Sequence, residues 1–229
     1  ILPELAACAG LSQNEYHAYD VFEHSVRTAA RVRPDVALRL AALWHDIGKG
    51  PTRSLGPDGR VHFYGHERVS AELVGAIGER LRLPGGTRQR IVVLVRHHQY
   101  PFSPEITPAA FRRVVARVGR EAFADLIELV WADRLATGRI RRSDADRLRT
   151  ELSRRFDALL ATDQALNRRQ LALDGRDVIS LLGVAPGPVV GEALSFLLER
   201  VLDDPALNRR SALEHCLREW WAARSASGG

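Results

Sequence analysis

The stretch that decides the fold is Leu43-Trp44-His45-Asp46-Ile47-Gly48-Lys49, an apolar helix end that carries an adjacent histidine and aspartate. Two small residues, Ala41 and Ala42, lie one turn before this pair and leave space for two liganding side chains. Gly48 is expected to end the helix, which places the histidine and the aspartate at an opening. The stretch therefore predicts a helical fold with a polar site where a helix ends.

Helical periodicity extends outward from this stretch, and no segment shows the alternation that is typical of paired strands. The pattern predicts helices at residues 19–32, 35–47, 65–82, 86–99, 108–118, 120–137, 142–163, 174–182, 188–203 and 208–223. Two segments interrupt it: residues 50–65, with the turn Gly56-Pro57-Asp58-Gly59, and the proline-punctuated loop 100–108. Within the first of these, residues 61–63 are expected to form at most a short extended segment.

The chain is predicted to be all-α. Its 229 residues are enough for one large domain or two small ones. We expect a helical bundle at 1–141, a charged connecting helix at 142–165 and a smaller helical module at 166–229. Residue 1 is isoleucine rather than methionine, so we also expect more chain upstream.

Charge and cysteine content limit the class of protein. The formal net charge of +5 favours anionic partners such as nucleotides or nucleic acid. No run approaches the roughly 20 apolar residues that a membrane span needs, and no secretory leader opens the chain. Cys8 and Cys216 lack metal-type spacing and do not suggest a disulfide framework. We therefore predict a cytoplasmic protein without a membrane partner, and the oligomeric state stays open.

Donors from three predicted helices could form one mixed metal site: His24, His45, Asp46 and Asp133. Asp133 follows apolar residues of its own helix by three, four and seven positions, so its carboxylate emerges from the apolar face. A buried carboxylate costs several kcal/mol unless it is paired or bound to a metal. Imidazole nitrogen and carboxylate oxygen are the usual ligands of divalent transition ions. The four residues therefore predict a metal centre.

Later histidines extend this array through His62, His66 and the pair His97-His98. With them, Asp46 would bridge to a second ion held by His66 and by either His97 or His98. A single histidine on an apolar face is more often a hydrogen-bonded core residue than a ligand. The metal hypothesis rests on the conjunction, because six of the eight histidines lie in this array. The other two are assigned to surface or packing roles: His17 and His215.

Lys49 is the only lysine, so that 32 of the 33 Lys and Arg residues are arginine. A lysine kept beside the candidate site favours a role in holding an anionic group of a ligand, with Arg53 as a second candidate. The alternative for Lys49 is a helix C-terminal cation favoured by the helix dipole. Asp46, Lys49 and His66 are the catalytic candidates, and either His62 or His66 is a candidate general acid. The substrate-binding candidates are Lys49, Arg53 and His62.

The order of these motifs resembles that of a known superfamily. His24, His45-Asp46 and Asp133 are similar to the signature of the HD phosphohydrolases, and the additional histidines resemble those of its two-metal members. Four stretches look more specifically like the C-terminal HD region of bacterial CCA-adding enzymes and poly(A) polymerases: Val21–Ser25, Leu43–Lys49, Arg60–Glu67 and Val95–His98. The likeness continues in two stretches near the end of the chain: Leu173–Val178 and Gly187–Gly191.

The resemblance implies phosphodiesterase or phosphatase activity on nucleotides or RNA ends, including 2′,3′-cyclic phosphates. It implies one or two divalent ions, which could be manganese, nickel, iron, magnesium or zinc. Histidine-rich ligation favours a transition ion over magnesium. The implied partners are a nucleotide or RNA 3′-end substrate and tRNA.

The polymerase head of that family is not expected in this chain. Its Gly-Ser turn and DxD pair on a strand are absent, and Asp144-Ala145-Asp146 is interpreted as a solvated helix face. The competing hypothesis is a binding module, the tRNA-binding C-terminal half of a tRNA nucleotidyltransferase with a vestigial metal site; regulatory nucleotide sensing is a third. Arginine clusters would contact phosphates in the binding module: Arg139, Arg141-Arg142, Arg154-Arg155 and Arg168-Arg169.

Overall fold

The computed structural model describes residues 1–57, 59–103, 105–162 and 165–227, and these are mainly helical. The helices are α1 (Pro3–Ala6), α2 (Val21–Arg31), α3 (Val36–Trp44), α4 (Lys49–Thr52), α5 (His66–Arg80), α6 (Gly85–His97), α7 (Pro108–Val118), α8 (Arg120–Ala136), α9 (Arg142–Leu160), α10 (Gly175–Leu182), α11 (Pro188–Asp203) and α12 (Arg210–Ser227). Single 3-10 turns lie at Arg168–Gln170 and Pro205–Leu207, and two short strands, β1 (Ser54–Leu55) and β2 (Val61–His62), pair antiparallel. The all-α prediction is confirmed.

The main local differences from the predicted helices follow the metal motif. The helix predicted over 35–47 ends at Trp44, and a separate short helix, α4, begins at Lys49. The extended segment expected at 61–63 has a partner strand, because Leu55 pairs with Val61 across the turn. Asp58 of that turn and Pro104 of the loop 100–108 lie outside the described residues.

Two compact units make up the chain. The first comprises residues 1–104 and 118–155, and the second comprises 105–117 and 156–229. The chain passes between the units at three points: before α7, near the end of α7 and inside α9. The expected functional boundaries at 1–141, 142–165 and 166–229 stay a prediction.

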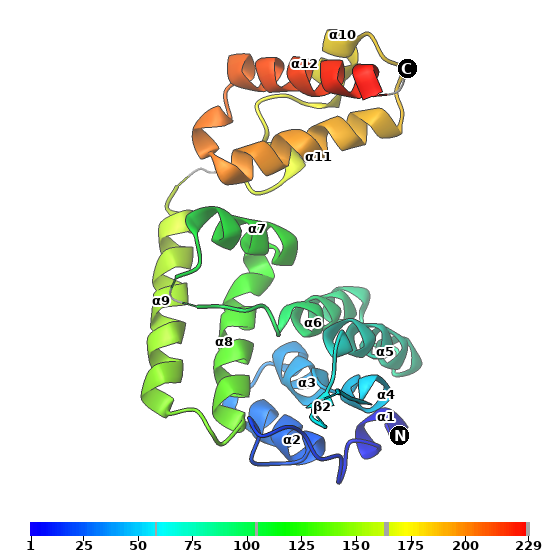
Figure 1. Cartoon of the computed structure of the whole chain (residues 1–229), viewed down its shortest axis with the longest axis vertical. Helices are drawn as coiled ribbons and strands as arrows, with labels where there is room; N and C mark the ends of the chain where they lie inside the picture. Colours follow the sequence, from blue (N-terminus) through cyan, green and yellow to red (C-terminus); the bar gives the residue numbers. More distant parts are fainter. Residues whose placement is uncertain (58, 104, 163–164, 228–229) are drawn as a thin grey trace. The chain divides into compact units, whose positions relative to one another are not determined.

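The first unit is a bundle in which α3 packs against α2, α6 and α8, while α5 packs along α6 (Figure 1). Aspartates begin two of these helices: Asp20 accepts the N–H of Glu23, and Asp35 accepts that of Leu38. Large buried side chains fill the centre: Leu38, Trp44, Ile91, Leu94, Phe123, Leu126 and Leu129. Because α3 is surrounded by other helices, the residues at its C-terminal end are enclosed.

An ion cluster ties three parts of this bundle together. Asp125 of α8 is 3% exposed and accepts from Arg90 of α6, with Nε to Oδ2 at 2.6 Å. Arg33, between α2 and α3, contacts the other Asp125 oxygen and also Glu128, at 2.6 Å from Nη1 to Oε2. The cluster fixes α8, and therefore Asp133 further along it, relative to α3.

The second unit has a core of its own. Its buried residues include Leu173, Val178, Leu197, Val201, Leu213 and Leu217, from α10, α11, α12 and the chain before them. Asp174 and Asp177 form a capping box at the start of α10. No helix among the described residues is long and apolar enough to cross a membrane.

Candidate metal centre

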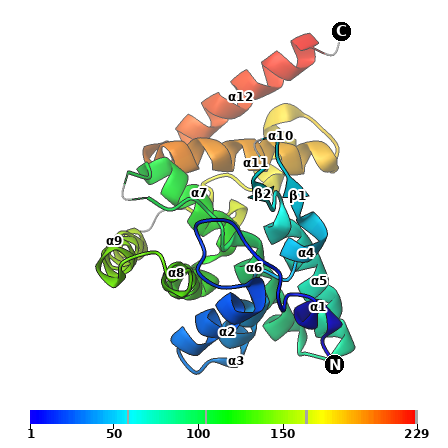
Figure 2. The ribbon, with the colours of Figure 1, turned by 60° about the horizontal axis from the view of Figure 1, so that its bottom comes forward.

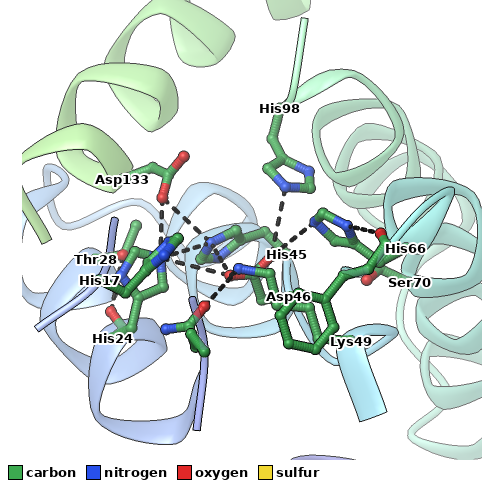
Figure 3. A network of polar contacts seen from close by, with 12 residues as sticks. His17, His24, Thr28, His45, Asp46, Lys49, His66, Ser70, His98 and Asp133 are labelled. Atoms are coloured by element: carbon green, nitrogen blue, oxygen red, sulfur yellow. Dashed lines mark hydrogen bonds and ion pairs between the residues drawn. The ribbon is translucent and has the colours of Figure 1, made fainter. Parts of the chain in front are cut away.

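Asp46 lies at the centre of a buried cluster of histidines and carboxylates in the first unit (Figure 3). It follows α3 by two residues and is 1% exposed. Its two carboxylate oxygens face different sets of partners. Oδ2 faces His24 of α2, His45 and Lys49, while Oδ1 faces the start of α5 and the end of α6.

The first donor set consists of His24, His45, Asp133 and Asp46 Oδ2. His24 Nε2 lies 2.9 Å from Asp133 Oδ1, 3.2 Å from His45 Nε2 and 3.5 Å from Asp46 Oδ2. His45 Nε2 lies 3.2 Å from Asp46 Oδ2 and 3.5 Å from Asp133 Oδ1. His24, His45 and Asp133 each offer one donor atom within 4.8 Å of the other two, and His45, Asp46 and His98 form a second such group.

The second set is formed by His66, His98 and Asp46 Oδ1. His66 Nε2 lies 3.1 Å from that oxygen and His98 Nε2 lies 3.6 Å from it. All three atoms are buried, and none makes a well-angled hydrogen bond within the described part of the chain. Buried polar atoms are normally satisfied, so two imidazole nitrogens directed at one carboxylate oxygen suit a site that binds a cation.

Backbone contacts orient three of the four rings. His45, His66 and His98 each place Nδ1 at 2.7–2.8 Å from the carbonyl three residues earlier, on Ala42, Phe63 and Val95. A carbonyl only accepts, so Nδ1 carries the proton in each ring and Nε2 is directed at Asp46. A ligand imidazole held through its other nitrogen in this way is the usual arrangement at metal centres.

The spacing of these atoms fits divalent metal ions. Ligands at about 2.0–2.2 Å from an ion lie roughly 3.0–3.5 Å from one another in octahedral or tetrahedral geometry. The donor contacts of the first set span 2.9–3.5 Å, and those of the second set are 3.1 and 3.6 Å. Histidine and aspartate groups of this site can therefore hold a metal ion.

Opposite charges lie close together at the centre. Burial disfavours a charged His45, but Asp46 and Asp133 outweigh it and raise the pKa of His45 to about 10. Burial also opposes the charge on Asp46, yet His45 and Lys49 hold its pKa well below the usual range. The pKa of Asp133 is lowered by hydrogen bonds from His24 and His45 despite burial. Burial lowers the pKa of His98, which keeps that ring in the neutral, ligating form.

Lys49 is the buried cation of the site, at 3% exposure. Its Nζ lies 2.6 Å from Asp46 Oδ2 and 2.6 Å from Gln13 Oε1. It also lines a hollow of about 250 Å³ beside the centre, together with Asn14, His17, His62, Phe63, Tyr64, Gly65, His66 and Gln99. A ligand in the hollow would reach the side of the metal centre on which Lys49 lies.

The structure places two of the predicted residues away from this centre. His97 does not point to Asp46 and instead lines a separate hollow with Glu67, Arg96 and Gln99. Adjacent residues at a helix end point in different directions, and His98 is the one that faces inward. Arg53 is exposed at the end of α4 and is not among the residues that line the 250 Å³ hollow, whereas His62 is.

Three polar residues of the site carried no signal in the sequence. Gln13 and Asn14 lie in the irregular segment between α1 and α2 (Figure 2), and Gln99 follows α6. His17, assigned to a surface or packing role, lines the hollow, and its ring lies edge-on to that of His24 at 5.2 Å. His215, by contrast, is exposed on α12 beside Glu219. No periodicity marks a loop residue that folds back over a site.

The helical bundle and its buried histidine–aspartate cluster define a helical domain of the kind that holds divalent metal. The sequence profile of the HD domain matches residues 15–138, which is more than half of the chain and includes every residue that converges on Asp46. The chain belongs to the HD domain family.

Two of the curated relatives are named tRNA nucleotidyltransferases, and a third is named a multifunctional CCA protein. The A-adding tRNA nucleotidyltransferase of Deinococcus radiodurans is 41% identical over 208 residues, covering 86% of this chain and 46% of the relative. The CC-adding tRNA nucleotidyltransferase of Thermus thermophilus is 38% identical over 204 residues, covering 86% and 44%. The multifunctional CCA protein of Variovorax paradoxus is 30% identical over 204 residues, covering 85% and 46%. The chain thus spans under half the length of these relatives.

Proposed function

We propose that the chain is a divalent-metal-dependent phosphohydrolase that cleaves phosphate esters of nucleotides or RNA 3′ ends, including 2′,3′-cyclic phosphates. One observation carries the proposal. One oxygen of Asp46 faces His24 and His45, which both also contact Asp133, and the other oxygen faces His66 and His98. A carboxylate shared in this way suits a pair of ions that act on one phosphoryl group.

The chain's own residues divide the work of binding and proton transfer. Bound ions would activate water for attack at phosphorus and neutralise charge on the phosphoryl oxygens. Lys49, whose Nζ lies 2.6 Å from Asp46, would bind a phosphate oxygen that enters from the hollow. His66 commits Nδ1 to the Phe63 carbonyl and directs Nε2 at Asp46. The role of proton donor to the leaving oxygen is therefore better suited to His62, which also lines the hollow.

The substrate class follows from charge and from the relatives. A net charge of +5 favours anionic ligands, and the relatives bear names of enzymes that act on tRNA. Those names describe proteins of which the match covers only 46% and 44%, so nucleotide addition is not proposed for this chain. A nucleotide or an RNA end is the substrate that agrees with both observations.

A second candidate is a tRNA-binding module with a non-catalytic metal site. It is favoured by the length of the match, since 86% of the chain resembles the first relative, well beyond the HD profile at 15–138. The arginine clusters support the binding module less strongly, because Arg154 and Arg155 already form ion pairs with Glu151. A metal centre with every donor in place favours the enzyme.

The two candidates are separated by one set of measurements. Bound metal, hydrolysis of nucleoside 2′,3′-cyclic phosphates and of linear nucleotides, and tRNA affinity are compared for the wild type, Asp46→Asn and the exposed-histidine control His215→Ala. We expect Asp46→Asn to lose at least about 100-fold in turnover while keeping tRNA affinity and helical content, and the control to match the wild type. A wild type that binds tRNA in a salt-sensitive manner but hydrolyses nothing would establish the binding module instead.

A further inference from the structure

The rim of the hollow carries an aromatic ring with unusual exposure. Tyr64 is 78% exposed, so its side chain contributes little to the core. Its ring is nevertheless held in place, because it stacks on His62 with 5.0 Å between centroids and 9° between planes. One face of the tyrosine is therefore supported by an imidazole and the other faces outward. Such a platform is what a nucleobase stacks on in proteins that bind single-stranded nucleic acid.

The backbone fixes this platform relative to the metal centre. His62 ends β2, and the next residue, Phe63, is 8% exposed and anchors the segment in the core. Gly65 has φ 72°, a conformation that glycine adopts at no cost, and turns the chain directly into α5. The first residue of α5 is His66, whose Nε2 lies 3.1 Å from Asp46. The exposed Tyr64 therefore lies only two positions before His66, a metal-binding candidate.

The remaining lining of the hollow supplies the other groups that a nucleotide requires. Lys49 offers a cation for phosphate, and Asn14 and Gln99 offer amides for ribose hydroxyls or base edges. His17 donates from Nδ1 to the Asn14 Oδ1 oxygen at 2.9 Å. The hollow thus presents a phosphate site, neutral hydrogen-bonding groups and an aromatic face together.

We infer that Tyr64, supported by His62, is the surface on which the substrate's nucleobase stacks while its phosphate reaches Lys49 and the metal centre. The inference rests on the proposed function and makes it more specific. The substrate must carry a base, and it need not be one particular base, because every base has a π-face. Tyr64 is a binding residue under this account and takes no part in the chemical step.

The first test compares substrates with and without a base. Nucleoside 2′,3′-cyclic phosphates and the base-free methyl riboside 2′,3′-cyclic phosphate are assayed with the wild type, Tyr64→Ala, Tyr64→Phe and the control Tyr16→Ala. Tyr16 is also well exposed, at 65%, and is not among the residues that line the hollow. We expect Tyr64→Ala to lower kcat/KM by about 5- to 150-fold for the nucleosides and by less than about twofold for the base-free ester. Tyr64→Phe and the control should retain the wild-type values.

The second test does not depend on turnover. Fluorescence of 2-aminopurine riboside 3′-phosphate is quenched when its base stacks, so it reports stacking whether or not the ester is cleaved. We expect saturable quenching with the wild type and Tyr64→Phe, and its loss with Tyr64→Ala. Quenching without hydrolysis would support the platform and overturn the proposed function. Hydrolysis with equal effects of Tyr64→Ala on both substrate types, or no quenching by the wild type, would overturn the platform.

Discussion

Gly48 is the residue whose replacement by alanine tests the packing of the metal centre most sharply. A Cβ at Gly48 would lie 2.5 Å from the His66 carbonyl oxygen and 2.6 Å from the Ser70 nitrogen, both of them backbone atoms of α5. A side-chain rotation cannot relieve these contacts, so α4 and α5 must separate. Overpacking of this kind costs about 1–3 kcal/mol. Loss of the 2.9 Å hydrogen bond from Gly48 N–H to Ser70 Oγ adds about 1 kcal/mol.

Gly48→Ala should therefore lower the free energy of unfolding of the first unit by about 2–4 kcal/mol. The matched control is Gly75→Ala in the middle of α5, where an added Cβ meets nothing within 4 Å. That change should be neutral or should stabilise by up to about 1 kcal/mol, because alanine favours a helix. Hydrogen exchange of amides in α3 and α5 reports the first unit alone. Equal hydrogen-exchange protection of these amides in Gly48→Ala and Gly75→Ala would refute the close approach of Gly48 to the backbone of α5.

Further predictions concern an ion cluster, a thiol and the metal. Asp125→Ala removes the carboxylate between Arg33 and Arg90 and should lower the free energy of unfolding by about 2–4 kcal/mol. The control Glu72→Ala, at an exposed ion pair, should lower it by less than about 1 kcal/mol, and urea unfolding measures both. Burial raises the pKa of the Cys8 thiol from 9.0 to about 11, so this thiol ionises at lower pH in the unfolded chain than in the folded one. The free energy of unfolding should therefore fall by about 2–3 kcal/mol between pH 9 and 11, relative to that of Cys8→Ala. An equal pH dependence of the two proteins would contradict the burial of that thiol. Manganese at 100 times its Kd should raise the unfolding free energy by about 2.7 kcal/mol in the wild type and not in Asp46→Asn.

The longer helices of this chain were predictable because they carry strong local signals, whereas the four-residue helices α1 and α4 were not predicted. Aspartates begin α2 and α3, glycines and prolines separate the elements, and apolar residues recur with helical spacing. The convergence of His24, His45, Asp46 and Asp133 was anticipated from the chemistry of buried carboxylates and imidazoles. The predicted metal-binding role of these residues awaits measurement.

Other features depend on contacts between segments that are distant in the sequence, and no local pattern encodes them. Asp125 looks like an ordinary helical acid until α6 and the loop after α2 bring Arg90 and Arg33 to it. The choice between His97 and His98 depends on the rotation of the last turn of α6, which is set by packing. His17 joins the site only because the irregular segment before α2 folds back over it.

Anomalous diffraction from crystals grown with manganese tests the central claim most directly. The account predicts two peaks, one within bonding distance of His24, His45, Asp133 and one Asp46 oxygen, the other beside His66, His98 and the second Asp46 oxygen. Peaks confined to surface carboxylates, with the Asp46 carboxylate still bound to Lys49 and no density near His24, would contradict it.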